Sequence, residues 1–456
     1  MKKKVLCSLL GGVLVCSLTA CGTQKNKRPV GGREPLSFQE IDADDIVYSD
    51  DVNWSGNEEW GADQMDADFA DQYMELSIRL LQQENAQDTD TVSVNMPPET
   101  SAVPSVQSTA KKQLMWSPLC FYQSMLLVEA CAGGETRGQM QDLLARGMQL
   151  KEQKINFFNF QNNLTDEKQA KLKTANEVWA DSKLSLNPIF EQTAVDTYQI
   201  DVHVRPNEPE TVDAINQRVS EKTKGRIPNI LHRLPADGAV DFVSALFFDA
   251  KWAQKYTAGN IHENVMFHGA NGAESKVTMM YSSENNYMSD DLSEGFVKPY
   301  AKGYSFAAFL PKNNMDIDTY LTKLSGSRLT ALLQRADARS TIKAGIPQFT
   351  AESEISLKDA LQKLGMTDAF DLEKANFSHL LAKGEETKVC VSDLFQHVKM
   401  DVDQHAKKAK ESDSVKAQKC ASLNGNVNVI LDRPFVYAII DQQTELPILI
   451  GVVRQL

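Results

Sequence analysis

Histidine, glutamate and serine occur in two patterns close to known catalytic motifs, and neither pattern has the required spacing. Zinc proteases place two histidines four residues apart on one helix face, whereas His262, which precedes Glu263, is six residues from His268. The exposed serine of many hydrolases lies between two glycines, but Ser305 has only Gly303 before it. These residues therefore predict neither a zinc protease nor a serine hydrolase.

Two Ser-x-x-Lys pairs could provide a serine nucleophile with a neighbouring lysine. Ser108 and Lys111 lie in a proline-containing polar stretch, and Ser340 with Lys343 lacks the motifs that accompany such a pair. No glycine-rich phosphate-binding loop is present. We therefore predict that the protein is not an enzyme and uses no catalytic residue, metal or cofactor.

Composition narrows the class of protein. The chain has 456 residues, of which 42% are hydrophobic and 24% are charged, as in ordinary globular proteins. The net charge of −13 argues against a nucleic-acid partner, because phosphate binding requires a basic surface. A mean hydropathy of −0.36, with one apolar stretch at the start, excludes a polytopic membrane protein.

The first 20 residues have the pattern of a signal peptide. Lys2 to Lys4 precede a short apolar run, Val5–Leu18, and small residues lead to Cys21. The run Leu18–Gly22 resembles a bacterial lipobox, which implies cleavage before Cys21 and attachment of lipid to its thiol. We expect a protein held on the extracellular side of the cell membrane by this lipid anchor alone. The alternative is an ordinary secretory signal that contains a cysteine by chance.

The remaining cysteines form no CxxC pair. Cys120, Cys131, Cys390 and Cys420 allow three disulfide pairings, and their spacing does not choose among them. We favour buried free thiols at Cys120 and Cys131.

The mature chain is predicted to have a tether and a folded domain. Residues 21–62 are acidic and predict an extended segment, since no Lys or Arg occurs between Arg33 and Arg79. A calcium site there lacks the spaced ligands and fixed glycine of such sites. The folded domain is expected over residues 63–456, with a flexible insertion at about 84–113 that contains three prolines.

Apolar spacing indicates both helices and strands in this domain. Helical periodicity covers Phe69–Gln82, the segment after Ser117-Pro118, and Leu357–Leu364. Several of the strand-like runs are apolar on both faces, as expected for covered strands. The strand-like runs are Val243–Phe248, Phe306–Leu310, Val391–Phe395, Val427–Leu431, Val436–Ile440 and Ile448–Val453. The domain is therefore predicted to be of the α+β class.

A dozen short motifs follow one another between residues 117 and 451. Most of their residues are ones that core packing would select, so they bear on the fold and not directly on activity. The motifs are Ser117-Pro118-Leu119, Thr174-Ala175-Asn176 with Trp179, Ile215-Asn216 running through Thr223-Lys224-Gly225-Arg226-Ile227, Val243–Phe248 with Trp252, Phe267 with Val277 and Met279-Met280, Pro299-Tyr300, Leu310-Pro311, Ile346-Pro347-Gln348-Phe349, Leu364-Gly365-Met366 with Ala369-Phe370, Ala375-Asn376-Phe377-Ser378, Asp432-Arg433-Pro434-Phe435 and Ile448-Leu449-Ile450-Gly451.

In this order and spacing the motifs resemble the serpins, and the resemblance covers residues from about 65 to 456. It implies three β-sheets with eight or nine helices, and an exposed reactive loop between the strand at Val391–Val402 and the one ending at Arg433. A target protease would cleave the loop and form an acyl-enzyme, and the loop would then insert into the central sheet. The resemblance thus implies a monomeric suicide inhibitor of an extracellular serine or cysteine protease.

The predicted hinge of this loop departs from the family pattern, which is glutamate-rich and then small. The hinge residues are Gln404, His405, Ala406, Lys407, Lys408 and Ala409, followed by Lys410 and Glu411. Only Ala409 matches well, and both possible registers of an inserted strand would bury charge, which costs several kcal/mol for an unpaired ion. The alternative function is therefore a non-inhibitory binding module or a bait substrate. A lipoprotein of another kind, such as a solute-binding protein, would not share the motifs.

The scissile bond is predicted within four residues, Cys420, Ala421, Ser422 and Leu423. Counting from Gln404 by the family spacing gives Cys420 as the residue before the cut, whereas counting back from Pro434 gives Leu423. Either would suit a protease with an apolar or small primary pocket. Lys416 or Lys419 could instead serve a trypsin-like enzyme.

A second departure lies on the strand before the hinge. Gln396 stands where the family usually has a histidine, and the adjacent His397 could replace it only if the strand shifted by one residue. We interpret His397 as a structural residue.

Overall fold

The computed structural model describes residues 65–86, 113–164, 170–235, 239–270, 272–336, 341–404 and 427–456. The chain divides into two units, Met1–Ile46 and Val47–Leu456, and every described residue lies in the second unit. The predicted signal peptide, the predicted lipidation site Cys21 and the predicted acidic tether lie outside the described residues. No helix in the described ranges combines the length and the apolar character that crossing a membrane requires.

Nine α-helices occur in the described part of the chain. The predicted first helix extends through Ala86, so the first residues assigned to the insertion belong to it. The second helix begins where a serine caps it: the Ser117 hydroxyl accepts the backbone N–H of Cys120, and Pro118 occupies the first turn. The helices are α1 (Ala67–Ala86), α2 (Pro118–Cys131), α3 (Gly134–Ala145), α4 (Leu150–Asn162), α5 (Pro188–Asp196), α6 (Pro209–Lys222), α7 (Ile317–Lys323), α8 (Gly326–Gln334) and α9 (Lys358–Lys363).

The strands of the described residues form three sheets, as the resemblance implies. The five-stranded sheet has the order β11 (Phe349–Ser356), β12 (Val391–Val402), β4 (Val240–Ala250), β2 (Ala170–Asp181) and β3 (Asp201–Arg205). The six-stranded sheet has the order β1 (Leu114–Trp116), β15 (Pro447–Val453), β14 (Phe435–Asp441), β9 (Tyr304–Pro311), β8 (Ser293–Pro299) and β7 (Asn286–Ser289). The four-stranded sheet has the order β13 (Val427–Ile430), β10 (Ile342–Pro347), β6 (Glu274–Glu284) and β5 (Ile261–His268).

This architecture confirms the α+β class and the predicted helices and strands. Each strand-like run of the sequence lies within a strand, except that Leu431 follows the end of β13 at Ile430, and the helix expected over Leu357–Leu364 is α9. The strand over Val243–Phe248 is longer than that run: β4 continues past it through Asp241 and Asp249 to Val240 and Ala250.

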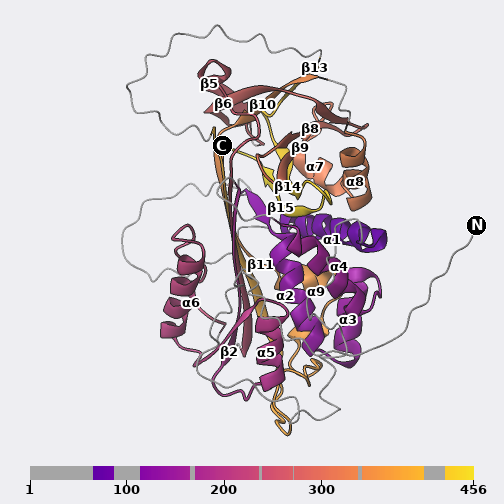
Figure 1. Cartoon of the computed structure of the whole chain (residues 1–456), viewed down its shortest axis with the longest axis vertical. Helices are drawn as coiled ribbons and strands as arrows, with labels where there is room; N and C mark the ends of the chain where they lie inside the picture. The colour runs from indigo at the N-terminus through magenta and orange to yellow at the C-terminus, as the bar shows by residue number, and fades with distance from the viewer. Residues whose placement is uncertain are drawn as a thin grey trace, which may run out of the picture. The chain divides into compact units, whose positions relative to one another are not determined.

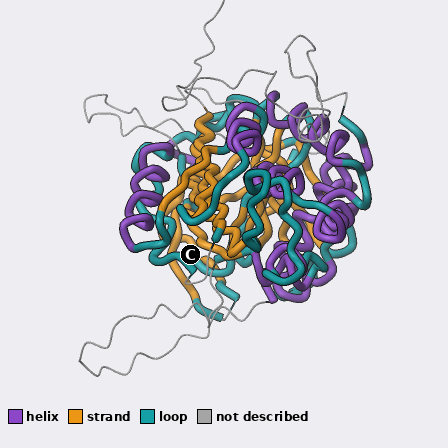
Figure 2. Tube along the Cα trace, turned by 90° about the horizontal axis from the view of Figure 1, so that it is seen from below, coloured by secondary structure: helices purple, strands orange, loops and turns teal. Residues whose placement is uncertain are grey.

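Helices cover both faces of the five-stranded sheet. Figure 1 shows α6 on one face and α2 and α9 on the other, and Figure 2 shows strands between groups of helices. The main core includes Phe242, Leu246 and Phe248 of β4, and a second core under α6 includes Val243 and Ala245 of the same strand. Since alternate residues of a strand point to opposite faces, both faces of β4 are buried and its sequence is mostly apolar.

Candidate functional site: the junction between β4 and β12

The central feature of the five-stranded sheet is a pair of neighbouring parallel strands, β4 and β12. Their register runs from Val391 opposite Val240 to Met400 opposite Phe248. The other neighbours of these strands, β2 and β11, are antiparallel to them. Because β4 and β12 end at the same edge, a chain turning back from the end of β12 would run antiparallel to both strands. This β4–β12 junction could therefore accept one more strand between its members.

The chain leaves the junction at the residues that the sequence assigns to the hinge. Val402 ends β12, and Gln404 is the last described residue before the chain resumes at Val427. Val427 begins β13, which pairs with β10 in the four-stranded sheet. Residues 405–426 therefore connect two different sheets. The remaining hinge residues, His405 to Ala409, and the scissile-bond candidates, Cys420 to Leu423, lie outside the described residues.

A buried tryptophan joins the two strands at this end of the junction. The indole Nε1–H of Trp252, two residues after β4, donates a hydrogen bond of 2.8 Å to the carbonyl oxygen of Asp403. The Trp252 ring is buried and stacks on Tyr300, with ring centroids 4.2 Å apart and planes at 16°. This hydrogen bond fixes the backbone one residue before Gln404. The motifs included Trp252, but its contact with Asp403 could not be read from them.

A buried ion pair lies next to the ring of Trp252. Lys298 of β8 pairs with Glu284 of β6, and both side chains are at least nine-tenths buried. The Lys298 ammonium lies 5.4 Å from the Trp252 ring centroid and 4.8 Å from that of Tyr256, which are cation–π distances. The position of the indole is therefore tied to the other two sheets.

In the middle of the junction, Gln396 takes the position where the family usually has a histidine. Its side-chain amide donates to the carbonyl of Ser117 at 3.1 Å, and its side-chain oxygen accepts the Ser117 backbone N–H at 2.5 Å. Ser117 is the cap of α2, so Gln396 connects β12 to the start of that helix. A glutamine provides these two bonds without the titration of a histidine.

His397 points to the opposite face of the sheet and links β12 to the segment after α6 and to β11. Its Nδ1 lies 2.9 Å from the carbonyl oxygen of Asn229, and its Nε2 lies 2.9 Å from a carboxylate oxygen of Glu352 on β11. Both partners are acceptors, so each ring nitrogen of His397 faces a hydrogen-bond acceptor. His397 is thus a structural residue that holds the chain after α6 against the sheet, and it does not replace the family histidine.

The far end of the junction contains two facing acidic residues. A bulge between Val391 and Asp393 makes Asp393 the register partner of Asp241, and the Ser392 hydroxyl accepts the backbone N–H of Ala239 at 2.9 Å. Asp241 is 4% exposed, and its Oδ1 has no hydrogen-bond partner. Burial, followed by the charge of Asp393, raises the pKa of Asp241 to about 7. At neutral pH this end therefore carries an electrostatic penalty.

The described cysteines agree with the expectation for Cys120 and Cys131. Both are buried, Cys120 forms no disulfide, and the Cys131 thiol donates to the carbonyl of Leu127 at 3.0 Å. Burial raises the pKa of Cys120 to about 12, so this thiol is not a reactive nucleophile.

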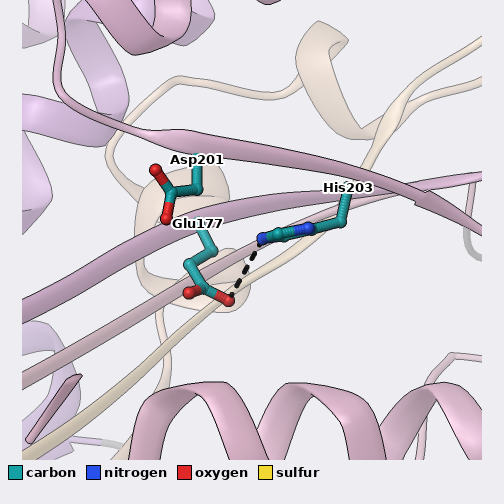
Figure 3. Close-up of side chains that lie close together, drawn as sticks. All are labelled: Glu177, Asp201 and His203. Carbon is teal, nitrogen blue, oxygen red and sulfur yellow. Dashed lines mark ion pairs between the residues drawn. The ribbon is translucent and has the colours of Figure 1, made fainter. Parts of the chain in front are cut away.

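One cluster in the described residues has the donor atoms of a metal site, and it lies away from the junction. It consists of Glu177, Asp201 and His203, whose donor atoms lie within 4.8 Å of one another (Figure 3). The pair His262 and His268, which the sequence patterns singled out, does not belong to such a cluster.

Comparison with known proteins agrees with this geometry. Residues 103–456 match the family model described as serpin (serine protease inhibitor). Among curated relatives, Serpin-Z2A of Triticum aestivum is 25% identical over 371 residues, which cover 77% of this chain and 92% of the relative. Plasminogen activator inhibitor 1 of Bos taurus is 24% identical over 378 residues, which cover 77% of this chain and 88% of the relative.

Solved structures give the same result. The thermophilic serpin tengpin in its native state superposes with a TM-score of 0.74 and 30% sequence identity, covering 86% of this chain and 95% of tengpin. Tengpin in its latent state gives a TM-score of 0.69 and 29% identity, with coverage of 86% and 99%. The match of the family model, the agreement in fold and the arrangement of the β4–β12 junction lead to one conclusion. The chain belongs to the serpin family.

Proposed function

We propose that this protein inhibits extracellular serine or cysteine proteases as a suicide substrate, with residues 405–426 as its reactive loop. The observation that carries the proposal is the β4–β12 junction, where two parallel strands lie side by side and the chain leaves β12 at their common end. Several relatives are protease inhibitors by name, among them plasminogen activator inhibitor 1 of Bos taurus.

In the proposed reaction the protease supplies all the covalent chemistry. Its serine or cysteine attacks the scissile carbonyl within Cys420–Leu423, the peptide C–N bond breaks, and the amine leaves as a new amino terminus. The residues before the cut stay bound to the protease as an acyl-enzyme. The freed segment then enters the junction as an antiparallel strand and hydrogen-bonds to both β4 and β12. The energy comes from the new sheet contacts, so the inhibitor itself needs no catalytic residue or cofactor.

Two features would oppose the proposed insertion. The hydrogen bond from Trp252 to Asp403 must break, and a charged hinge residue such as Lys407 or Glu411 must be accommodated on one face of the sheet. Each inserted residue contributes about 1 kcal/mol of net hydrogen bonding, whereas one unpaired buried charge costs several kcal/mol. The charged hinge should therefore slow insertion relative to a hinge of small residues.

The test of inhibition is incubation of the purified protein with a panel of serine and cysteine proteases. We expect a complex that survives a denaturing gel, with cleavage at Cys420 to Leu423 identified by sequencing the new amino terminus. Ala409→Arg is the matched variant, because it adds a long charged side chain at the best-matching hinge position; it should be cleaved at the same bond without forming the complex. Cleavage of the natural protein without any stable complex would favour a bait or binding role.

We also propose that the protein is anchored by lipid at Cys21 on the extracellular side of the membrane, where it would meet secreted proteases. The support is the lipobox-like run Leu18–Gly22 after a short apolar segment. Labelling of cells with a radioactive fatty acid should mark the natural protein and not Cys21→Ser. Secretion of an unlabelled natural protein would instead indicate an ordinary signal peptide.

A further inference from the structure

Two strands bring a histidine and two carboxylates together on the face of the five-stranded sheet that α6 covers. Asp201 and His203 are two residues apart on β3, so they point to the same face. Glu177 on β2 is the register partner of Asp201, and Trp179 is the partner of His203. Figure 3 shows the imidazole and the Glu177 carboxylate pointing toward one another, with Asp201 beside them.

One ring nitrogen of His203 is available to bind a metal, because it makes no hydrogen bond. Its Nε2 is buried, has no hydrogen-bond partner and lies 3.8 Å from Oε2 of Glu177. The ring is held in place over Trp179, with centroids 4.2 Å apart.

The gap between these atoms suits a bound cation. Zinc binds imidazole nitrogen and carboxylate oxygen at about 2.0–2.2 Å in tetrahedral geometry, which separates two ligand atoms by about 3.4 Å. A shift of a few tenths of an ångström would bring Nε2 of His203 and Oε2 of Glu177 to that separation. The indole Nε1–H of Trp179 already donates to Oε2 of Glu177 at 3.1 Å and orients the carboxylate.

Two basic residues of α6 currently neutralise the carboxylates. Lys222 lies 3.1 Å from Oε1 of Glu177 and 2.7 Å from Oδ2 of Asp201, and Arg218 lies 3.2 Å and 2.7 Å from the same two atoms. Two negative and two positive charges cancel, so a divalent cation would bind only if the basic groups moved away. Their side chains are 18% and 36% exposed, so both have a route to solvent.

We propose that Glu177, Asp201 and His203 form a binding site for Zn²⁺ or a similar first-row divalent cation, which exchanges with Lys222 and Arg218 of α6. Two carboxylates and one imidazole are ligands that such cations accept, with water completing the coordination. When the cation is bound, α6 keeps its apolar contacts in the second core but loses its ion pairs to β2 and β3. Binding of the cation would therefore weaken the attachment of α6 to the sheet.

The experiment is a titration of the untagged, metal-free natural protein with ZnCl₂, followed by calorimetry. We expect one saturable site, weakened at least about tenfold by His203→Gln, since loss of a ligand costs more than loss of an outer partner. Nε2 of His203 makes no hydrogen bond, so this variant should melt close to the natural protein without metal. His262→Gln, at a histidine on β5 outside the cluster, should bind Zn²⁺ as the natural protein does.

Competition with α6 is tested independently by Lys222→Met. Removing a cation that opposes Zn²⁺ should strengthen binding by about tenfold. Co²⁺ should give the visible absorption of a nitrogen- and oxygen-ligated site, and Zn²⁺ should speed hydrogen exchange of the amides of α6. The proposal is overturned if saturable binding is absent, if it is unchanged in His203→Gln, or if Lys222→Met weakens it.

Discussion

Single side chains control the two ends of the β4–β12 junction in opposite ways. At the end near the hinge, the Trp252 indole bonds to the Asp403 carbonyl and so closes the junction. At the far end, the paired carboxylates of Asp241 and Asp393 repel one another across the same two strands. One end of the junction is therefore held by a hydrogen bond, whereas at the other end charge repulsion favours separation of β4 and β12.

Trp252→Phe should loosen the hinge end of the junction. The change keeps an aromatic ring over Tyr300 but removes the hydrogen bond to Asp403, at a net cost of about 0.5–1.5 kcal/mol. We expect faster protease cleavage within residues 405–426, measured on a gel time course. Trp116→Phe is the control, because its ring is equally buried and its Nε1 makes no hydrogen bond. Equal cleavage rates in the two variants would contradict this role of Trp252.

Asp241→Asn should stabilise the protein in a pH-dependent way. Burial raises the pKa of Asp241 from 3.8 to about 7, so the folded state binds a proton more tightly than the unfolded state. The natural protein should therefore lose stability as pH rises from about 4 to about 7, by up to about 4 kcal/mol from this group. Thermal midpoints should show the variant more stable at pH 8 and equal at pH 4. A constant difference at both pH values, or an equal effect of Asp213→Asn at an exposed position of α6, would refute the explanation.

At the scale of elements, α6 covers β2 and β4, and β4 is one of the two strands that the proposed insertion would separate. Its apolar residues Val212, Ile215 and Val219 pack on β2 and β4 in the second core, with Ile227 to Leu231 of the following segment. That segment is also held to β12 by His397 through the Asn229 carbonyl. An additional strand at the junction would therefore lie under α6 and its following segment, so the packing of this cover influences the cost of insertion.

Ile215→Ala tests whether the packing of α6 on the sheet influences insertion. Ile215 is fully buried, and truncation of such a side chain costs about 2–5 kcal/mol because it leaves a cavity. We expect a lower midpoint in urea unfolding together with faster formation of the protease complex. Leu333→Ala on α8 is the control, because Leu333 is also buried but lies in the main core. If Leu333→Ala accelerates complex formation as much as Ile215→Ala does, the effect is one of general stability.

At the scale of the whole molecule, the chain after the junction enters a different sheet. β12 belongs to the five-stranded sheet, and β13 pairs with β10 in the four-stranded sheet. As long as residues 405–426 are intact, their two ends are held in separate sheets. In the proposed reaction, cleavage would remove this constraint and free the segment attached to β12 to add to the sheet.

Cleavage within residues 405–426 should raise the thermal midpoint of the protein. A strand of about ten residues in the junction would gain on the order of 10 kcal/mol of hydrogen bonding, which corresponds to roughly 10 °C for a domain of this size. Differential scanning calorimetry before and after cleavage measures this change. The same cut in Ala409→Arg should give a smaller rise. An unchanged midpoint in the natural protein would mean that the segment does not insert.

Local patterns in the sequence determined the types of the elements and their order. Apolar runs such as Val243–Phe248 and Phe306–Leu310 lie within strands, and Ser117-Pro118 begins a helix, because hydrophobic periodicity and capping act over a few neighbouring residues. The ordered motifs also indicated the family, since they mark buried positions along the whole chain. The hinge and scissile residues remain predictions from the sequence.

Contacts between distant segments were decided only by the tertiary structure. The sequence placed His397 and Gln396 side by side, but the strand register determined that Gln396 faces α2 and His397 faces Asn229 and Glu352. The same holds for Trp252 and Asp403, and for the cluster of Glu177, Asp201 and His203. Which side chains meet depends on strand pairing, bulges and helix packing, and a one-residue change of register reverses every face. No spacing along the chain encodes those distances.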